Sequence, residues 1–197
     1  MTASTFKWDD EPDPTELWKA VGLLSSDREA ALALLRNLAA RGSIMSMIYL
    51  GHNIAIQSPF SANRKEALAW YRKAAVSGVP FAIYSLCKAL HVNGNFEEEI
   101  HLLQSEQLLD YGPALNQLAC IYRDGEHVPR DPAKAEELYR RAHEVGHLTA
   151  MRNLGAFYTK GLGGLRKIPL GIYLLVAVLP AFFREYARDG FRSERLM

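Results

Sequence analysis

The chain has 197 residues, of which 49% are hydrophobic and 23% are charged, and its formal net charge is +1. This balance excludes a strongly basic nucleic-acid-binding domain and an acidic tail as the main feature of the protein. The high hydrophobic share excludes disorder over most of the length, and a chain of this size can bury a core without disulfide staples.

Cysteine usage and the first residues of the chain favour the cytoplasm. Cys87 and Cys120 do not form a disulfide framework, and neither belongs to a C-x-x-C motif. The first ten residues are polar and acidic, without the basic and then apolar pattern of a secretory signal. We therefore expect a cytoplasmic protein with a flexible acidic N-terminus over residues 1–13.

The first predicted elements are a partly degenerate pair of helices over residues 14–42. Residues 14–24 and 26–40 each show a helical apolar pattern. Ser26 and Glu29 have the spacing of a capping box, which predicts that the second helix of this pair begins after Ser26.

Four glycines divide the following sequence into units of nearly constant length. Gly42, Gly78, Gly112 and Gly146 lie 36, 34 and 34 residues apart, and each follows an amphipathic run, as expected of a glycine that ends a helix. After each glycine, a small residue precedes a leucine by four positions, which places the two on one helix face. These pairs are Ser46 and Leu50, Ala82 and Leu86, Ala114 and Leu118, and Ala150 and Leu154.

The third unit shows the plan of one repeat most fully. Residues 114–122 predict a first helix ended by Gly125, a loop with two prolines follows, and residues 133–145 predict a second helix closed by Gly146. Short helix pairs bury both faces only when they stack, so the sequence predicts an all-α fold, an α-solenoid of about four to five antiparallel pairs. The expected pairs, in a single domain, cover about residues 14–42, 43–78, 79–112, 113–146 and 147–183, with a C-terminal tail over 184–197.

The recurring residues resemble the Sel1-like repeat, a relative of the tetratricopeptide repeat. Residues 66–75 followed by Gly78 match its second half, and residues 150–163 match its first half. The third unit matches throughout, at Ala114, Leu118, Tyr122, Gly125, Lys134, Ala135, Leu138, Tyr139, Arg141, Ala142 and Gly146. The resemblance covers about residues 43–180. It departs from the repeat pattern at 57–63, at 96–111 and after Gly164.

This resemblance implies a non-catalytic scaffold or adaptor that binds a protein or peptide partner. Such proteins are often bacterial, and some relatives are immunity proteins that block a toxin. In a solenoid the first helix of each pair lines the concave surface, where partners usually bind. The expected partner-binding residues there are Tyr84, Lys88, Asn116, Gln117, Arg123, Arg152 and Asn153. The alternative for each is an ordinary solvated position on a helix.

Two patterns resemble ligand sites but are better explained by the repeat. His143 and His147 have the spacing of two metal ligands on one helix, but Gly146 should end the helix between them. The glycine-rich run 161–167 lacks the G-K-[ST] ending of a phosphate-binding loop, and no strand precedes it. We therefore expect no metal, no cofactor and no nucleic-acid partner.

The only hint of a catalytic pair is Cys87 with His91, four residues later on the same helix face. Small buried thiols that pack between helices are far more common than nucleophiles. We expect no catalytic residue, and an enzyme or regulatory subunit with a site around this pair stays open as an alternative.

Residues 168–183 form an uncharged stretch in the place of the last repeat's second helix, flanked by Arg166, Lys167 and Arg184. From Ile172 to Leu179 every residue is apolar, so this helix has no obvious wet face. The favoured environment is packing beneath the folded-back tail, or self-association; the alternatives are a partner's groove and a membrane, for which the stretch is short. The expected hydrophobic interface is Ile172, Leu175, Val176, Leu179, Phe182 and Phe183.

Overall fold

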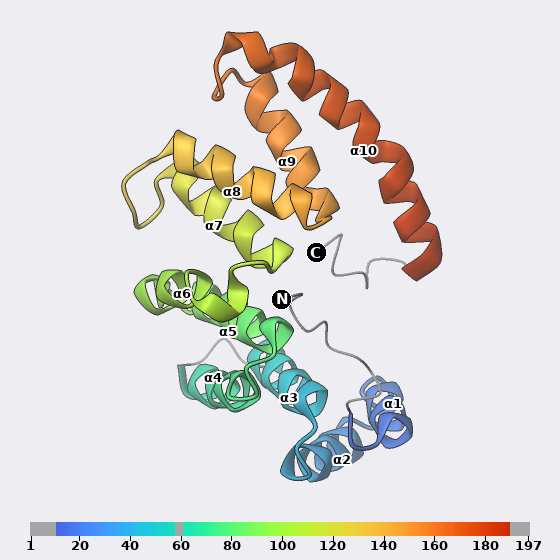
Figure 1. Ribbon diagram of the computed structural model, residues 1–197. Coiled ribbons are helices and arrows are strands. Elements are labelled where there is room, and N and C mark those ends of the chain that lie inside the picture. Colours follow the sequence, from blue (N-terminus) through green and yellow to red (C-terminus); the bar gives the residue numbers. More distant parts are fainter. Residues whose placement is uncertain (1–10, 58–60, 190–197) are drawn as a thin grey trace. The chain divides into compact units, whose positions relative to one another are not determined.

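Every regular element among the residues that the structure describes is helical (Figure 1). The structure is a computed structural model, and it describes residues 11–57 and 61–189. The chain divides into two compact units, of which the first ends at Leu102 and the second begins at Leu103. The predicted all-α repeat fold is confirmed.

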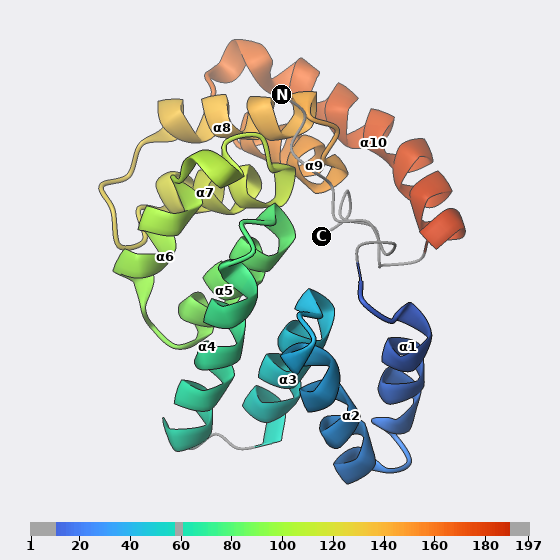
Figure 2. The ribbon, with the colours of Figure 1, turned by 60° about the horizontal axis from the view of Figure 1, so that its bottom comes forward.

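In the first unit each helix packs against the next one along the chain, from α1 to α5. Figure 2 shows α2 between α1 and α3. The helices of this unit are α1 (Pro14–Leu23), α2 (Arg28–Ala40), α3 (Ile44–Gln57), α4 (Ser61–Ala75), α5 (Pro80–Val92) and α6 (Phe96–Leu103), whose last residue already belongs to the second unit.

In the second unit α7 packs against α8, α8 against α9 and α9 against α10, and α7 also contacts α9 directly. That contact makes α7 and α9 the inner helices of two successive pairs. The elements are η2 (Glu106–Leu108), α7 (Gly112–Asp124), α8 (Pro132–Glu144), α9 (Leu148–Thr159), η3 (Leu165–Lys167) and α10 (Ile168–Asp189).

Aspartates begin three of the helices by accepting hydrogen bonds from otherwise unpaired backbone N–H groups. Asp13 accepts from Glu16 N at 2.9 Å, and Asp131 accepts from Lys134 N at 3.0 Å. The predicted capping box at Ser26 is wrong by one residue, because Asp27 is the cap of α2 and accepts from Ala30 N. An aspartate oxygen caps a helix at least as well as a serine hydroxyl, and here Asp27 takes the capping position in place of Ser26.

Three of the four periodic glycines end a helix with positive φ, but Gly112 does not. Gly42, Gly78 and Gly146 have φ of 94°, 73° and 86°, which favours glycine. Gly112 instead is the first residue of α7, and a Cβ built on it would lie 2.6 Å from Cβ of His147. The prediction that it closes a helix is therefore wrong. Its small size serves close packing at the start of α9.

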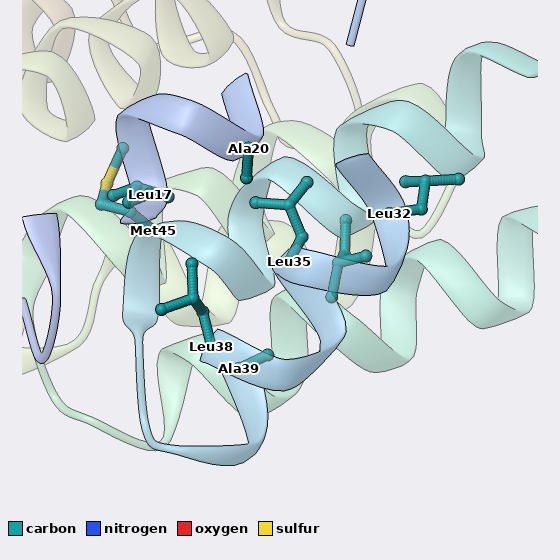
Figure 3. Packing of buried hydrophobic residues seen from close by; sticks show 8 residues of the cluster. Leu17, Ala20, Leu32, Leu35, Leu38, Ala39 and Met45 are labelled. Atoms are coloured by element: carbon teal, nitrogen blue, oxygen red, sulfur yellow. The ribbon is translucent and has the colours of Figure 1, made fainter. Parts of the chain in front are cut away.

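The core of the first unit is built from leucines that α1 and α2 direct toward α3 (Figure 3). Leu17, Leu35 and Leu38 are fully buried, and Met45 at the start of α3 packs with them. Their helical spacing places them on one face of each helix, as the apolar pattern of residues 14–42 predicted.

Glu11 is a buried carboxylate that sequence analysis assigned to a flexible segment. Its side chain is only 5% exposed, and Oε1 accepts from Met45 N at 2.9 Å. The hydroxyl of Ser43 donates to the other carboxylate oxygen. The carboxylate thereby satisfies the backbone N–H of Met45 in the first turn of α3, at the end of the helix that attracts negative charge.

Replacement of Glu11 by glutamine is expected to lower the free energy of unfolding by about 1–2 kcal/mol, because a charge-assisted hydrogen bond becomes a neutral one. Urea unfolding followed by circular dichroism measures this loss. Glu66→Gln, on an exposed position of α4, is the matched control and should change little. Equal losses in the two variants would contradict the role assigned to Glu11.

In the second unit aromatic side chains fill the space between α8 and α9. Tyr139 and Phe157 are buried and meet edge to face, with ring centroids 6.0 Å apart. Next to them α9 and α10 approach closely, since a Cβ on Gly171 would lie 2.8 Å from the carbonyl oxygen of Gly155. The helix pair is therefore packed backbone against backbone.

The last helix is longer than the sequence predicted. α10 continues through Asp189, so residues 184–189 are helical, whereas we expected the chain from Glu185 onward to fold back over the apolar stretch. Pro180 lies inside this helix and is exposed. Residues 190–197, the rest of the expected tail, lie outside the described residues, as do residues 1–10 of the expected N-terminal segment.

Candidate functional site

Three of the predicted partner-binding residues meet between the inner helices of the second unit. Asn153 on α9 donates through Nδ2 to Oδ1 of Asn116 on α7 at 2.9 Å. Arg152 donates to Oδ1 of Asn153 at 3.3 Å. Arg152 is exposed, while the two asparagines and the neighbouring Gln117 are half-buried. The inner helices thus carry a connected strip of amides with a cation beside it, which we call the amide strip (Asn116, Gln117, Arg152 and Asn153).

Arg123, at the end of α7, is engaged within the fold. It donates to the hydroxyl of Tyr139 on α8 at 3.0 Å, and its Nε donates to Asp124 at 2.7 Å. The hydrogen bond with Asp124 raises the pKa of Arg123 and lowers the pKa of that aspartate. A guanidinium held in this way is a poor anchor for a partner, because binding would have to replace both contacts.

The remaining predicted pair lies on α5 in the first unit. The ammonium of Lys88 sits 5.1 Å from the centre of the Tyr84 ring, a cation–π distance, and the tyrosine is only 7% exposed. Desolvation by the surrounding protein lowers the pKa of Lys88, although its side chain still reaches solvent. These two residues contact each other on α5, apart from the amide strip of the second unit.

Cys87 and His91 do not have the properties of a nucleophile and its base. Cys87 is fully buried, and desolvation together with the charge of Glu99 raises the pKa of its thiol to about 12. Nδ1 of His91 lies 3.0 Å from Oε2 of Glu99, a fully buried carboxylate. The thiol is therefore protonated at neutral pH, and the histidine contacts Glu99 through its Nδ1. Glu99 belongs to the acidic first turn of α6, together with Glu97 and Glu98.

The two patterns that resembled ligand sites have structural roles. α8 ends at Glu144 and α9 begins at Leu148, so His143 and His147 do not share a helix. The glycine run connects α9 to α10, and Lys167 pairs there with Glu136 on α8. Within the described part of the chain, no group of three His, Cys, Asp or Glu is placed to hold a metal ion.

The apolar helix α10 has one packed face and one open face. Leu175 and Phe182 of the predicted interface are half-buried on the side toward α9, where Leu174 and Val178 are buried. The other members are more than half exposed, and the sequence analysis missed two tyrosines beside them. We call this exposed set the α10 face: Ile172, Tyr173, Val176, Leu179, Phe183 and Tyr186.

Among the described residues, the segment Leu165–Arg188 alone is long and apolar enough to cross a membrane by length and composition. Its most apolar window has a mean hydropathy of 1.6, and only 17% of that window is buried.

A sequence model of the Sel1 repeat matches residues 45–78, 112–147 and 148–175. These matches fall on helix pairs that the structure shows, namely α3 with α4, α7 with α8, and α9 with α10. The chain is a Sel1-repeat protein. Sel1 repeats generally serve as scaffolds for protein–protein interactions and are typically non-catalytic.

Solved structures share the fold at low sequence identity. The Sel1 repeat protein from Oxalobacter formigenes aligns with a TM-score of 0.69 and 21% identity, covering 89% of this chain and 76% of that one. The protein c5321, a protective antigen of uropathogenic Escherichia coli with an SLR fold, aligns with a TM-score of 0.63 and 22% identity. That alignment covers 83% of this Sel1-repeat protein but only 38% of c5321.

The MamA RS-1 ArsTM double mutant aligns more distantly, with a TM-score of 0.55 and 14% identity over 85% of this chain and 96% of that one. Among curated proteins, none is significantly similar to this Sel1-repeat protein.

Proposed function

We propose that this Sel1-repeat protein is a cytoplasmic, non-catalytic adaptor that binds an extended segment of a protein partner on the amide strip. The observation that carries the proposal is the hydrogen bond between Asn116 and Asn153, which joins two inner helices through half-exposed amides. An amide side chain offers both a donor and an acceptor, which is what a peptide backbone needs. The strip can therefore hold an extended chain without regard to most of its side chains.

The charge beside the strip favours an acidic residue in that partner. Arg152 is exposed, and it makes a long hydrogen bond of 3.3 Å to Asn153. Breaking such a contact costs little, and a carboxylate can take two parallel hydrogen bonds from a guanidinium. By contrast, Arg123 donates hydrogen bonds to Tyr139 and Asp124, and these contacts link the end of α7 to α8.

A photo-crosslinking amino acid at position 117 is expected to capture the partner in native cell lysate, because Gln117 lies half-exposed within the strip. The same amino acid in place of Glu137, an exposed residue of the outer helix α8, is the matched control and should capture nothing specific. Mass spectrometry identifies the bound protein.

Once the partner is known, Arg152→Glu should weaken its binding by about tenfold or more, since a charge-assisted contact becomes a repulsion. Arg140→Glu, at an exposed position of α8, should leave binding unchanged. Crosslinks from position 137 in place of position 117, or equal binding by the two charge variants, would refute binding on the amide strip.

A further inference from the structure

The α10 face is a continuous apolar stripe along one side of the helix. Ile172, Val176, Leu179, Phe183 and Tyr186 follow one another at spacings of four and three residues, which keeps them on one side. Each is between 47% and 68% exposed, and so is Tyr173 beside them. Isolated exposed apolar residues are ordinary on a soluble protein, but an unbroken row of this length marks an interaction surface.

The exposed charges between positions 165 and 188 are of one sign. Arg166 is exposed six residues before Ile172, Arg184 is exposed next to Phe183, and Arg188 is exposed two residues after Tyr186. The one acidic residue between positions 165 and 188, Glu185, is only 3% exposed and accepts from Arg188 at 2.7 Å. The α10 face is therefore an apolar stripe with exposed cations before it and beside its last residues.

This charge pattern disfavours a second copy of the chain as the occupant. Parallel α10 helices would bring each arginine near the same arginine of the other copy, and in either direction the arginines would meet no exposed acidic residue between positions 165 and 188 of that copy. Like charges so placed cost free energy on association. A partner surface with an apolar interior and a negatively charged boundary would bury the apolar stripe and pair with the exposed arginines.

We propose that α10 docks in the plane of a lipid bilayer that contains anionic lipids, with the α10 face turned into the boundary between headgroups and acyl chains. Apolar and aromatic side chains enter that boundary favourably, and tyrosines place their hydroxyl groups at headgroup level. The exposed arginines before and beside the stripe meet the negative headgroups.

The contacts between α10 and α9 favour docking in the plane over crossing the membrane. Gly171, Leu174 and Val178 pack against α9 and are buried. To cross a bilayer, the helix would have to leave this interface and carry the buried carboxylate of Glu185 into the apolar core, which is costly. Docking in the plane uses only side chains that are already exposed and leaves the α9–α10 packing intact.

Flotation of the full-length chain with lipid vesicles tests the proposal. We expect the protein to float with vesicles of phosphatidylcholine containing about 30 mol % phosphatidylserine, and to bind far less to phosphatidylcholine alone. Val176→Glu combined with Phe183→Glu should reduce binding at least tenfold. Val76→Glu, which places the same charge on a valine 87% exposed in the first unit, should not change it.

The arginines and the mode of binding are tested in the same assay. Replacement of Arg166 and Arg184 by glutamine should weaken binding about fivefold for each arginine. Alkaline carbonate should release the bound protein, whereas resistance to carbonate would show a membrane-spanning helix and overturn docking in the plane. Arg152→Glu should leave flotation unchanged, so this result is independent of the amide strip.

Absence of flotation, or flotation that the double glutamate variant does not reduce, would overturn the proposal. A dimer in sedimentation that this variant converts to a monomer, without vesicle binding, would assign the α10 face to self-association. Circular dichroism of each variant confirms that loss of binding does not reflect unfolding.

Discussion

Replacement of Gly171 by valine is expected to lower the free energy of unfolding by about 3 kcal/mol and to detach α10 from α9. A Cβ at this position would lie 2.8 Å from the carbonyl oxygen of Gly155, and equally close to the backbone nitrogen of Thr159. Both neighbours are backbone atoms of α9, so no side-chain rotation can relieve the overlap. The helices would have to separate, and Leu174 and Val178 would lose their buried packing.

Gly22 provides a control for the same kind of change at a site without neighbours. It lies within α1, and a Cβ built on it meets nothing within 4 Å. Gly22→Ala should therefore stabilise the protein by about 0.5–1 kcal/mol, since alanine is the better helix former. Urea unfolding followed by circular dichroism compares the two variants with the wild type. A stability of Gly171→Val equal to that of the wild type would contradict the close packing of α9 and α10.

The sequence predicts the helix pairs well because the information for them is local. A glycine that must adopt positive φ, a proline in the first turn and an apolar stripe of helical period all act within a few residues. Gly112 shows the limit of this reasoning, because its small size is required by the close contact with His147, 35 residues away. From sequence alone the two roles of glycine cannot be distinguished.

Buried polar partners are the part of the structure that local patterns do not reveal. Glu11 caps α3 across more than 30 residues, and Glu99 is buried beside His91 although it belongs to a run of three glutamates. Position within a helix predicts that acidic residues are favourable in the first turn, but tertiary packing determines which of these carboxylates is buried and desolvated.

The candidate site was predicted in outline for the same reason. The repeat assigns Asn116 and Arg152 to inner helices, and the structure places them on either side of Asn153. The repeat pattern does not reveal that Arg123 donates to Tyr139, because that contact depends on which side chains face each other across a helix pair. On α10, composition predicted an apolar interface, and only the packing against α9 separates its covered side from the α10 face.

The protein is expected to lose stability steeply above pH 9, because two buried groups in the first unit are held in their protonated forms. Burial raises the pKa of Tyr71 from 10.0 to about 12, and burial together with Glu99 raises that of Cys87 from 9.0 to about 12. For groups whose pKa is higher in the folded state, the stability contribution is complete below the unfolded pKa. It is lost as the pH rises toward the folded pKa.

Cys87 and Tyr71 together should lower the free energy of unfolding at pH 11 by about 4 kcal/mol relative to pH 8, with Cys87 supplying about two thirds of this part. Burial also raises the pKa of Tyr139 and Tyr158 in the second unit, so these two tyrosines should lower it further. Urea unfolding at the two pH values measures it. Cys87→Ala should remove a larger part of the pH dependence than Tyr71→Phe, whatever each variant does to stability at pH 8. A pH dependence that neither variant changes would show that other groups control alkaline unfolding. Because its thiol is buried and protonated at neutral pH, Cys87 acts as a packing residue between helices.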